Sequence, residues 1–220
     1  MITQIAALVR QASRAVFNSP GVQYPQVNLG GDLAVAQGLP ERAELVRMGN
    51  SWSAQIKEAN AFTLLITIPS TLAELALQNG EATGGKSYVI DRFWCKTVTS
   101  TAAANYLTML AQVTPPGTAI VADSANKVVS SLSGKAAYTG KAQLAVHSVL
   151  TGALADKWVA AGNNNNLTSA ANIAAMVEAY CYGRYIIPPG GVFNLNAQEA
   201  VSGGTAILGV EWHEVQLDLG

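Results

Sequence analysis

The sequence predicts a mainly β protein, a jelly-roll-like antiparallel β-sandwich with an N-terminal α-helix. From Trp52 onward, apolar and polar residues alternate over short runs, which is the period of a half-buried strand. Clusters of glycine, proline and asparagine separate these runs, as they do in all-β sandwiches and barrels. We therefore expect an amphipathic helix or arm over residues 1–20 and a single sandwich domain over residues 21–220.

The expected helix rests on a pattern over residues 2–17. Apolar residues recur there at the spacing of one helix face, and the stripe consists of Ile5, Leu8, Val9, Ala12 and Val16. Pro20 and Gly21 end the pattern. An isolated helix of this length is marginal in water, so its stripe must be buried on something. It either packs on its own sandwich or forms an arm to a neighbouring subunit, and the second interpretation makes Ile5, Leu8, Val9 and Val16 candidate assembly contacts.

The strand-like runs follow in chain order. "SWSAQI" places on one face Trp52, Ala54 and Ile56. "FTLLITI" places on one face Phe62, Leu64, Ile66 and Ile68. "SYVIDRFWCKTVTS" places on one face Val89, Asp91, Phe93, Cys95 and Thr97. Later runs are "YLTMLAQV", "AQLAVHSVL", "DKWVAAG", "MVEAYCYGRYII" and "TAILGVEWHEVQL", while "LTSAANIAAMVEAY" also fits a helix from about Ser169.

One segment matches a phosphate-binding pattern. "GEATGGKS", residues 80–87, fits G-x-x-x-x-G-K-[ST], in which backbone amides and a lysine hold phosphates. That mechanism needs a buried parallel strand before the loop and a helix after it. Here "YVIDRFWCKTV" follows and favours a strand, while "LAELALQN" precedes and ends in a polar turn pair. A glycine-rich hairpin loop is the simpler prediction.

Other residues that could carry chemistry do not form a recognisable constellation. His147 and His213 lack partners at metal-ligand spacing, so no metal ligand, catalytic residue or cofactor-binding residue is predicted. Cys95 and Cys181 lie in apolar runs and are expected to be buried free thiols. The four tryptophans are expected to anchor the core or an interface, with a sugar site as the alternative; they are Trp52, Trp94, Trp158 and Trp212.

Composition bears on the partners. Of 220 residues only 12% are charged, the formal net charge is −1, and half of the residues are hydrophobic. So few charges indicate a surface that is partly buried against copies of the chain or another protein. The balance of charge predicts no nucleic-acid partner, and the apolar runs are too short to predict a membrane span. The first residues do not read as a secretory signal.

Two segments resemble virion structural proteins of tailed bacteriophages. They are "QGLPERAELVRMGNSW" at 37–52 and "RYIIPPGGVFNLNAQ" at 184–198, the second followed by "AILGVEWHEV". The resemblance is to jelly-roll proteins that decorate or cement a phage head. It implies a sandwich that oligomerises, with a trimer favoured, that contacts the major capsid protein or other virion proteins, and that has no active site.

The expected function follows from these observations. The first hypothesis is a head decoration or cement protein of a bacteriophage particle, made in the host cytoplasm and located in the virion. The alternative is a phage fibre, tail or surface module that binds host glycans through exposed tryptophans. A nucleotide-binding enzyme that uses residues 80–87 is the third hypothesis, and the leading expectation is that the chain is not an enzyme.

Overall fold

The computed structural model describes residues 41–70, 72–99, 105–115, 120, 128–131, 138, 140–149, 158–167, 176–200 and 203–217. The chain divides into two compact units, Met1–Glu41 and Arg42–Gly220, and the described strands lie in the second. The helix predicted over residues 2–17, its stripe and the boundary at residue 20 lie outside the described residues. The described part begins with a short helix that the sequence did not predict, α2 (Glu41–Arg47), and includes one 3-10 turn, η1 (Glu58–Asn60).

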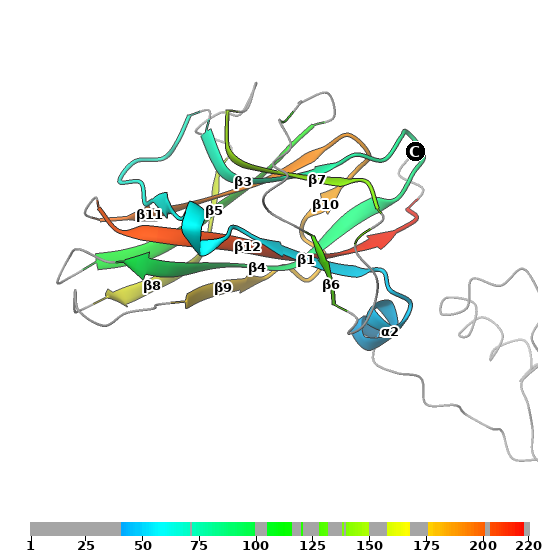
Figure 1. Ribbon diagram of the computed structural model, residues 1–220, viewed down its shortest axis with the longest axis horizontal. Helices are drawn as coiled ribbons and strands as arrows, with labels where there is room; N and C mark the ends of the chain where they lie inside the picture. Colours follow the sequence, from blue (N-terminus) through cyan, green and yellow to red (C-terminus); the bar gives the residue numbers. More distant parts are fainter. Residues whose placement is uncertain are drawn as a thin grey trace, which may run out of the picture. The chain divides into compact units, whose positions relative to one another are not determined.

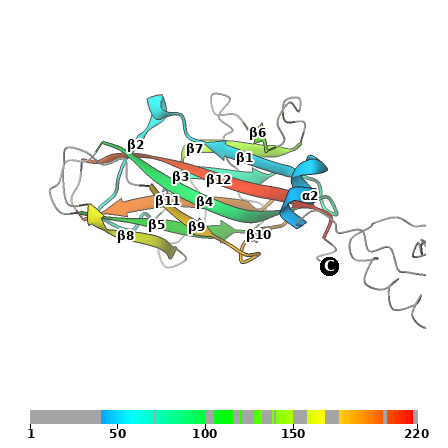
Figure 2. The same cartoon turned by 90° about the horizontal axis from the view of Figure 1, so that it is seen from below.

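The described strands form two antiparallel sheets, as the alternating pattern predicts. The first sheet contains β1 (Ser51–Gln55), β2 (Phe62–Thr63), β4 (Ser87–Thr99), β6 (Val129–Ser130), β9 (Met176–Tyr180), β10 (Ile186–Ile187) and β12 (Thr205–Val215). The second contains β3 (Leu72–Asn79), β5 (Asn105–Thr114), β7 (Ala142–Val149), β8 (Val159–Leu167) and β11 (Val192–Glu199). Figure 1 shows the two layers, and the turned view in Figure 2 shows β1, β12 and β4 side by side in one of them.

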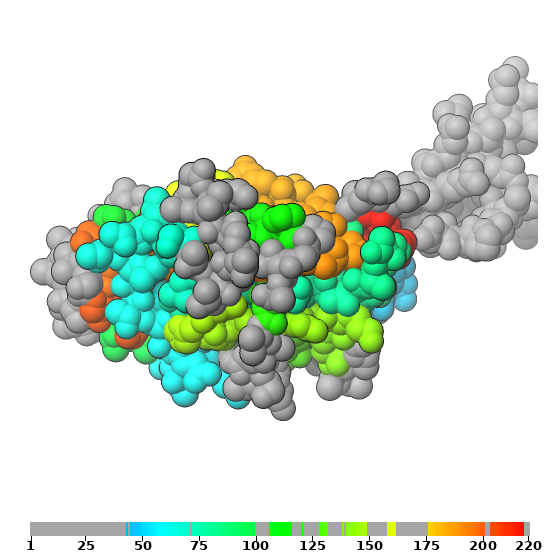
Figure 3. Space-filling model, turned by 90° about the horizontal axis from the view of Figure 1, so that it is seen from above, coloured from blue at the N-terminus to red at the C-terminus, as the bar shows by residue number. Residues whose placement is uncertain are grey.

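The strand order is that of a jelly roll. Strands from the first half of the chain pair with strands from the second half in nested fashion: β1 with β12, β3 with β11, β4 with β9 and β10, and β5 with β8. This is a long antiparallel ribbon folded over on itself, so that the paired strands alternate between the sheets: β1 with β12 and β4 with β9 and β10 lie in the first, and β3 with β11 and β5 with β8 lie in the second. The short β6 adds to β1 and β7 adds to β3, at the other edge of each sheet. Figure 3 shows the yellow-green atoms of β7 at the surface.

The two sheets enclose one main core. The first sheet contributes large side chains that are fully or almost fully buried, among them Trp52, Phe62, Tyr88, Phe93 and Trp212. The second sheet contributes Leu75, Leu77, Leu107, Met109, Phe193 and Leu195. Fully burying each such side chain contributes roughly 1.5–3 kcal/mol, and this burial holds the sandwich together. The predicted inward face of β1, with Trp52, Ala54 and Ile56, is confirmed.

Two predicted faces are corrected. In β4, a register shift opposite Glu211 and Trp212 leaves Asp91 as an extra residue, so Tyr88 and Ile90 face the core before this bulge and Phe93 and Cys95 after it. A bulge shifts the alternation by one residue, which strict period two cannot anticipate.

The second corrected face is that of "FTLLITI". Its regular strand is only two residues long, and although Phe62 and Leu64 are buried, Ile66 and Ile68 are exposed. In addition, "LAELALQN" forms β3, a buried antiparallel strand inside the second sheet. Its leucines and alanines favour a helix by intrinsic propensity, and pairing on both sides overrides that preference.

Asn79, at the end of β3, ties two turns together. Its buried side-chain amide Nδ2 donates to the carbonyl oxygens of Lys86 at 2.8 Å and Ile187 at 3.0 Å, and its Oδ1 accepts from the Glu81 amide at 3.0 Å. Its backbone carbonyl accepts from the Gly190 amide at 2.7 Å. The side chain thus connects the loop after β3 to the turn between β10 and β11.

The cluster of prolines and glycines at 188–191 separates two strands, as the sequence pattern predicts. The Gly191 amide donates to the Pro188 carbonyl at 2.9 Å, and Gly190 has a φ of 80°. Proline at the second position and a glycine with positive φ at the third are what a type II turn requires. This turn leads from β10 in the first sheet to β11 in the second.

Candidate functional site

One edge of the first sheet carries an interrupted strand. β9 and β10 both pair antiparallel with β4, one after the other, so together they take the place of a single edge strand. The Cys181 amide donates to the Asp91 carbonyl at 2.8 Å and the Ile90 amide to the Tyr185 carbonyl at 3.0 Å. Ile90 and Asp91 are neighbours in β4, whereas their partners Tyr185 and Cys181 are four positions apart. The three residues between those partners, 182–184, therefore project from the sheet edge.

The projecting residues form a tight turn with an unusual occupant. The Arg184 amide donates to the Cys181 carbonyl at 2.9 Å, and both central residues have positive φ, 47° for Tyr182 and 76° for Gly183. Two positive φ values define a type I′ turn, whose first central position usually holds asparagine, aspartate or glycine. A bulky side chain in this conformation costs about 1–2 kcal/mol. Such local strain is characteristic of residues retained for a contact.

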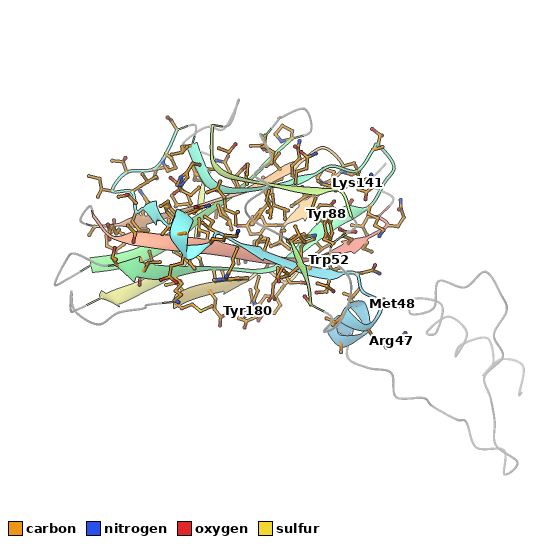
Figure 4. All side chains as sticks on the ribbon, viewed as in Figure 1. Arg47, Met48, Trp52, Tyr88, Lys141 and Tyr180 are labelled. Atoms are coloured by element: carbon orange, nitrogen blue, oxygen red, sulfur yellow. The ribbon has the colours of Figure 1, made fainter. Side chains whose placement is uncertain are left out.

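The exposed apolar side chains of β9, this turn and β10 are together called the edge patch. The patch consists of Met176, Tyr180, Tyr182 and Ile186, with exposed fractions of 51%, 46%, 92% and 38%. The rings of Tyr180 and Tyr182 lie 6.2 Å apart, centroid to centroid, at an interplanar angle of 32°. Figure 4 shows Tyr180 at the lower margin of the strands, away from Trp52 and Tyr88.

A charged cluster borders the edge patch on the outer face of the same sheet. Arg92 donates from Nε and Nη2 to both carboxylate oxygens of Glu211, each at 2.8 Å, and from Nη1 to Glu178 Oε2 at 3.2 Å. The bond to Glu211 raises the pKa of Arg92, so its positive charge is permanent. Tyr180 donates its hydroxyl to Glu178 Oε1 at 3.4 Å. The cluster thus links the side chains of β4, β9 and β12 on this face of the sheet.

Trp94 completes this outer face and depends on a glycine. The Arg92 guanidinium carbon lies 5.3 Å from the centre of the indole ring. Gly209, the cross-strand partner of Trp94, lies beneath the ring, because a Cβ there would fall 2.1 Å from Trp94 Cζ2. Tryptophan, tyrosine, arginine and methionine are the residues enriched in protein–protein interfaces, and all four occur together here.

Of the four tryptophans predicted to anchor the core or an interface, three are buried. Trp52, Trp158 and Trp212 are buried, at 4%, 8% and 0% exposure, and Trp94 is partly buried on the outer face. The free thiols of Cys95 and Cys181 are buried as predicted, and burial raises the pKa of Cys181 to about 12. Both thiols therefore stay protonated and unreactive at neutral pH.

Each of the two histidines pairs with one carboxylate. His213 Nδ1 lies 3.0 Å from Asp91 Oδ1 on the outer face of the first sheet. His147, which has a φ of 51°, pairs with the buried carboxylate of Glu74 in the second sheet. Within the described residues, no group of three or more histidine, cysteine or acidic side chains is placed to hold a metal ion. The described ranges also contain no helix of the length and apolar character that crossing a membrane requires.

The segment 80–87 lacks the geometry of a phosphate-binding loop. It leads from β3 in one sheet to β4 in the other, and both strands are antiparallel to their neighbours. It is therefore a connection between sheets rather than the predicted hairpin loop. Lys86 Nζ lies 3.4 Å from Glu214 Oε2, and the buried Glu214 also accepts the Tyr138 hydroxyl at 2.6 Å. The lysine thus has an acidic partner within the sandwich.

Comparison with known proteins adds no relative. No family model, no curated protein and no solved structure matches the chain.

The alternating pattern of the sequence does not predict the edge patch. Its signal is in "MVEAYCYGRYII", where Gly183 interrupts an otherwise continuous strand pattern. A lone glycine in a strand suggests a bulge. The candidate assembly contacts Ile5, Leu8, Val9 and Val16 lie outside the described residues, so the structure neither brings them together nor separates them.

Proposed function

We propose that the chain is a structural component of a bacteriophage particle, a head decoration or cement protein that acts through protein–protein contacts. The observation that carries the contact function is the edge patch, in which a strained and almost fully exposed tyrosine stands on a rigid sheet edge. Exposed aromatic residues next to an ordered arginine have the composition of an interface hot spot. The proposed partners are other copies of the chain, with a trimer favoured, and the major capsid protein or other virion proteins.

The phage assignment is supported by where the resembling segments lie. Residues 184–198 span β10, the proline-glycine turn and most of β11, and "AILGVEWHEV" forms most of β12. Both β11 and β12 are central strands of their sheets. The likeness to jelly-roll virion proteins therefore involves residues that build the sandwich.

The structure gives the glycan-binding alternative less support than the sequence does. It depends on exposed tryptophans, and three of the four are buried. The nucleotide-binding hypothesis likewise receives no support from the segment 80–87, because a parallel strand and a following helix are what the phosphate mechanism requires and β4 follows instead.

The composition and structure of purified particles test the proposal. Phage particles that encode the chain are purified through a density gradient, analysed by mass spectrometry and imaged by cryo-electron microscopy. We expect the chain in stoichiometric amount, as sandwich-shaped density on the head surface. Its presence in the lysate together with its absence from particles would overturn the proposal.

A further inference from the structure

We propose that two buried amide side chains of the second sheet, those of Gln112 and Asn194, bind ordered internal water. The site lies on the face of that sheet that is turned away from the main core. The inference does not depend on the proposed function, because it concerns a ligand held within the sandwich and not a contact with another protein.

Strand pairing places the two amides side by side. Gln112 of β5 and Asn194 of β11 are cross-strand partners, and the Cβ atoms of such partners lie about 4.5–5.5 Å apart. Their strand neighbours Ala111, Phe193 and Leu195 belong to the main core. Because successive side chains of a strand point to opposite faces, both amides lie on the face away from that core.

The site is closed off from solvent. Gln112 is 2% exposed, and Asn194 is fully buried. A second buried apolar cluster includes Leu110 and Val192, each two positions before one of the amides, together with the indole of Trp158. A ligand held by the two amides is therefore shielded from bulk water.

Three polar atoms of the pair lack a protein partner. The Nδ2 of Asn194 donates to Thr114 Oγ1 at 3.3 Å and to the Val192 carbonyl at 3.5 Å. In contrast, no hydrogen-bond partner among the described residues meets Asn194 Oδ1, Gln112 Oε1 or Gln112 Nε2. Buried polar atoms of native proteins are nearly always hydrogen-bonded, either to protein or to ordered water. The pair thus requires a ligand that both donates and accepts.

Water is the ligand that fits these atoms. A metal cation would bind the two amide oxygens and leave the Gln112 nitrogen without an acceptor, and hard cations are bound largely by carboxylates. The other cross-strand neighbour of Asn194 is Ala76, which brings no charge. A water molecule accepts a hydrogen bond from Gln112 Nε2 and donates one to Asn194 Oδ1, as internal waters do for otherwise unsatisfied polar groups. A second water of the same kind would meet Gln112 Oε1.

The direct test is a crystal structure of the full-length chain at a resolution that shows ordered water. We expect a solvent peak at a distance of about 2.7–3.2 Å from the amide atoms of both Gln112 and Asn194. A direct hydrogen bond between the two amides, another side chain between them, or an empty site would overturn the proposal. A cation would also overturn it, and is recognised by shorter distances to oxygen of about 2.3–2.6 Å.

Urea denaturation of full-length variants gives an independent readout. Gln112→Met and Asn194→Leu should each lower the urea midpoint, because each removes one partner of the water and leaves the other amide buried without it. The two losses should not add, so the double variant should lose clearly less than their sum. Additive losses would show that the two amides share no ligand.

The matched control combines Gln112→Met with Asn196→Leu. Asn196 is also fully buried on this face of β11, but its amide is already bonded, since Nδ2 donates to the Leu72 carbonyl at 3.1 Å and Oδ1 accepts from the Ala197 amide at 2.8 Å. The losses in the control pair should add. A departure from additivity as large as in the test pair would show that the coupling arises from packing on this face, which contradicts the proposal.

Discussion

At the residue scale, single polar side chains hold together parts of the chain that are distant in sequence. Asn79 connects the loop before β4 to the turn before β11 through three side-chain hydrogen bonds. Gly209 leaves the space that the Trp94 ring occupies. Glu74 places a carboxylate inside the second sheet with His147 as its partner. The chemistry of each of these residues depends on a neighbour that the linear sequence does not place beside it.

Asn79→Ala should destabilise the protein strongly. The change removes three hydrogen bonds and leaves the carbonyl groups of Lys86 and of the buried Ile187 without their amide donor, so we expect a loss of about 2–4 kcal/mol in the free energy of unfolding. Urea denaturation measures it. The half-buried Ser53→Ala in β1 serves as the control, with an expected change of ~0.5 kcal/mol or less. A loss below 1 kcal/mol at Asn79 would show that the two turns hold without its side chain.

Glu74 should make stability depend on pH. Burial raises the pKa of its carboxyl above 4.5, against the opposing effect of His147. Above pH 4.5 the folded chain then retains a proton that the unfolded chain has lost, so this residue's contribution to stability falls as the pH rises through the window from 4.5 to the raised pKa. Relative to wild type, Glu74→Gln should therefore gain stability with increasing pH across that window. Denaturation at several pH values tests this, with the exposed Glu58→Gln as control; a difference that is constant with pH would contradict it.

At the element scale, the edge of the first sheet combines a bulge in β4 with a projecting turn beside it. Asp91 is the extra residue of the bulge, and its backbone carbonyl accepts the hydrogen bond from Cys181, the residue at which the projection begins. Bulges bend and twist a strand, and at a sheet edge they re-aim side chains and end pairing. Together the two features present Tyr182 outward and limit strand addition along this edge.

Tyr182→Gly should stabilise the fold while it removes the proposed contact. Glycine adopts the φ of 47° at this position without steric cost, so we expect the free energy of unfolding to rise by about 1 kcal/mol. Gly183→Ala is the matched test of strain alone, because a Cβ at Gly183 meets nothing within 4 Å, and it should lose about 1 kcal/mol. Thermal melting of both variants measures the effects. A loss of stability in Tyr182→Gly would mean that the tyrosine is retained for folding.

At the scale of the whole molecule, the described part of the chain is a jelly-roll sandwich that exposes several apolar side chains. The described strands of the second unit form both sheets and the main core. The chain has few charged residues and, in the described part, ten large hydrophobic side chains classed as exposed, four of which form the edge patch. That combination favours association through contacts on the sandwich surface.

Removal of residues 1–18 should leave the sandwich folded and abolish self-association. We expect a far-ultraviolet circular dichroism spectrum that remains β-type, a melting temperature within a few degrees of the full-length value, and a monomer in sedimentation equilibrium, in contrast to the trimer proposed for the full-length chain. These expectations follow if the stripe is buried on another copy. Unfolding or aggregation of the shortened chain would show instead that the helix belongs to its own core.

The sequence by itself determined the fold class and much of the core. Alternation and turn residues suffice to predict a sandwich, because strands such as β1 show their buried face through local period two, as in Trp52, Ala54 and Ile56. The type II turn at Pro188 to Gly191 was likewise predictable, since proline and glycine restrict φ locally. Only the tertiary structure decided the rest. Three features depend on which strands lie next to one another: whether "LAELALQN" is a strand, where the bulge in β4 falls, and whether Tyr182 reaches solvent. Strand pairing joins residues about a hundred positions apart, and contacts between such distant residues leave no local period in the sequence.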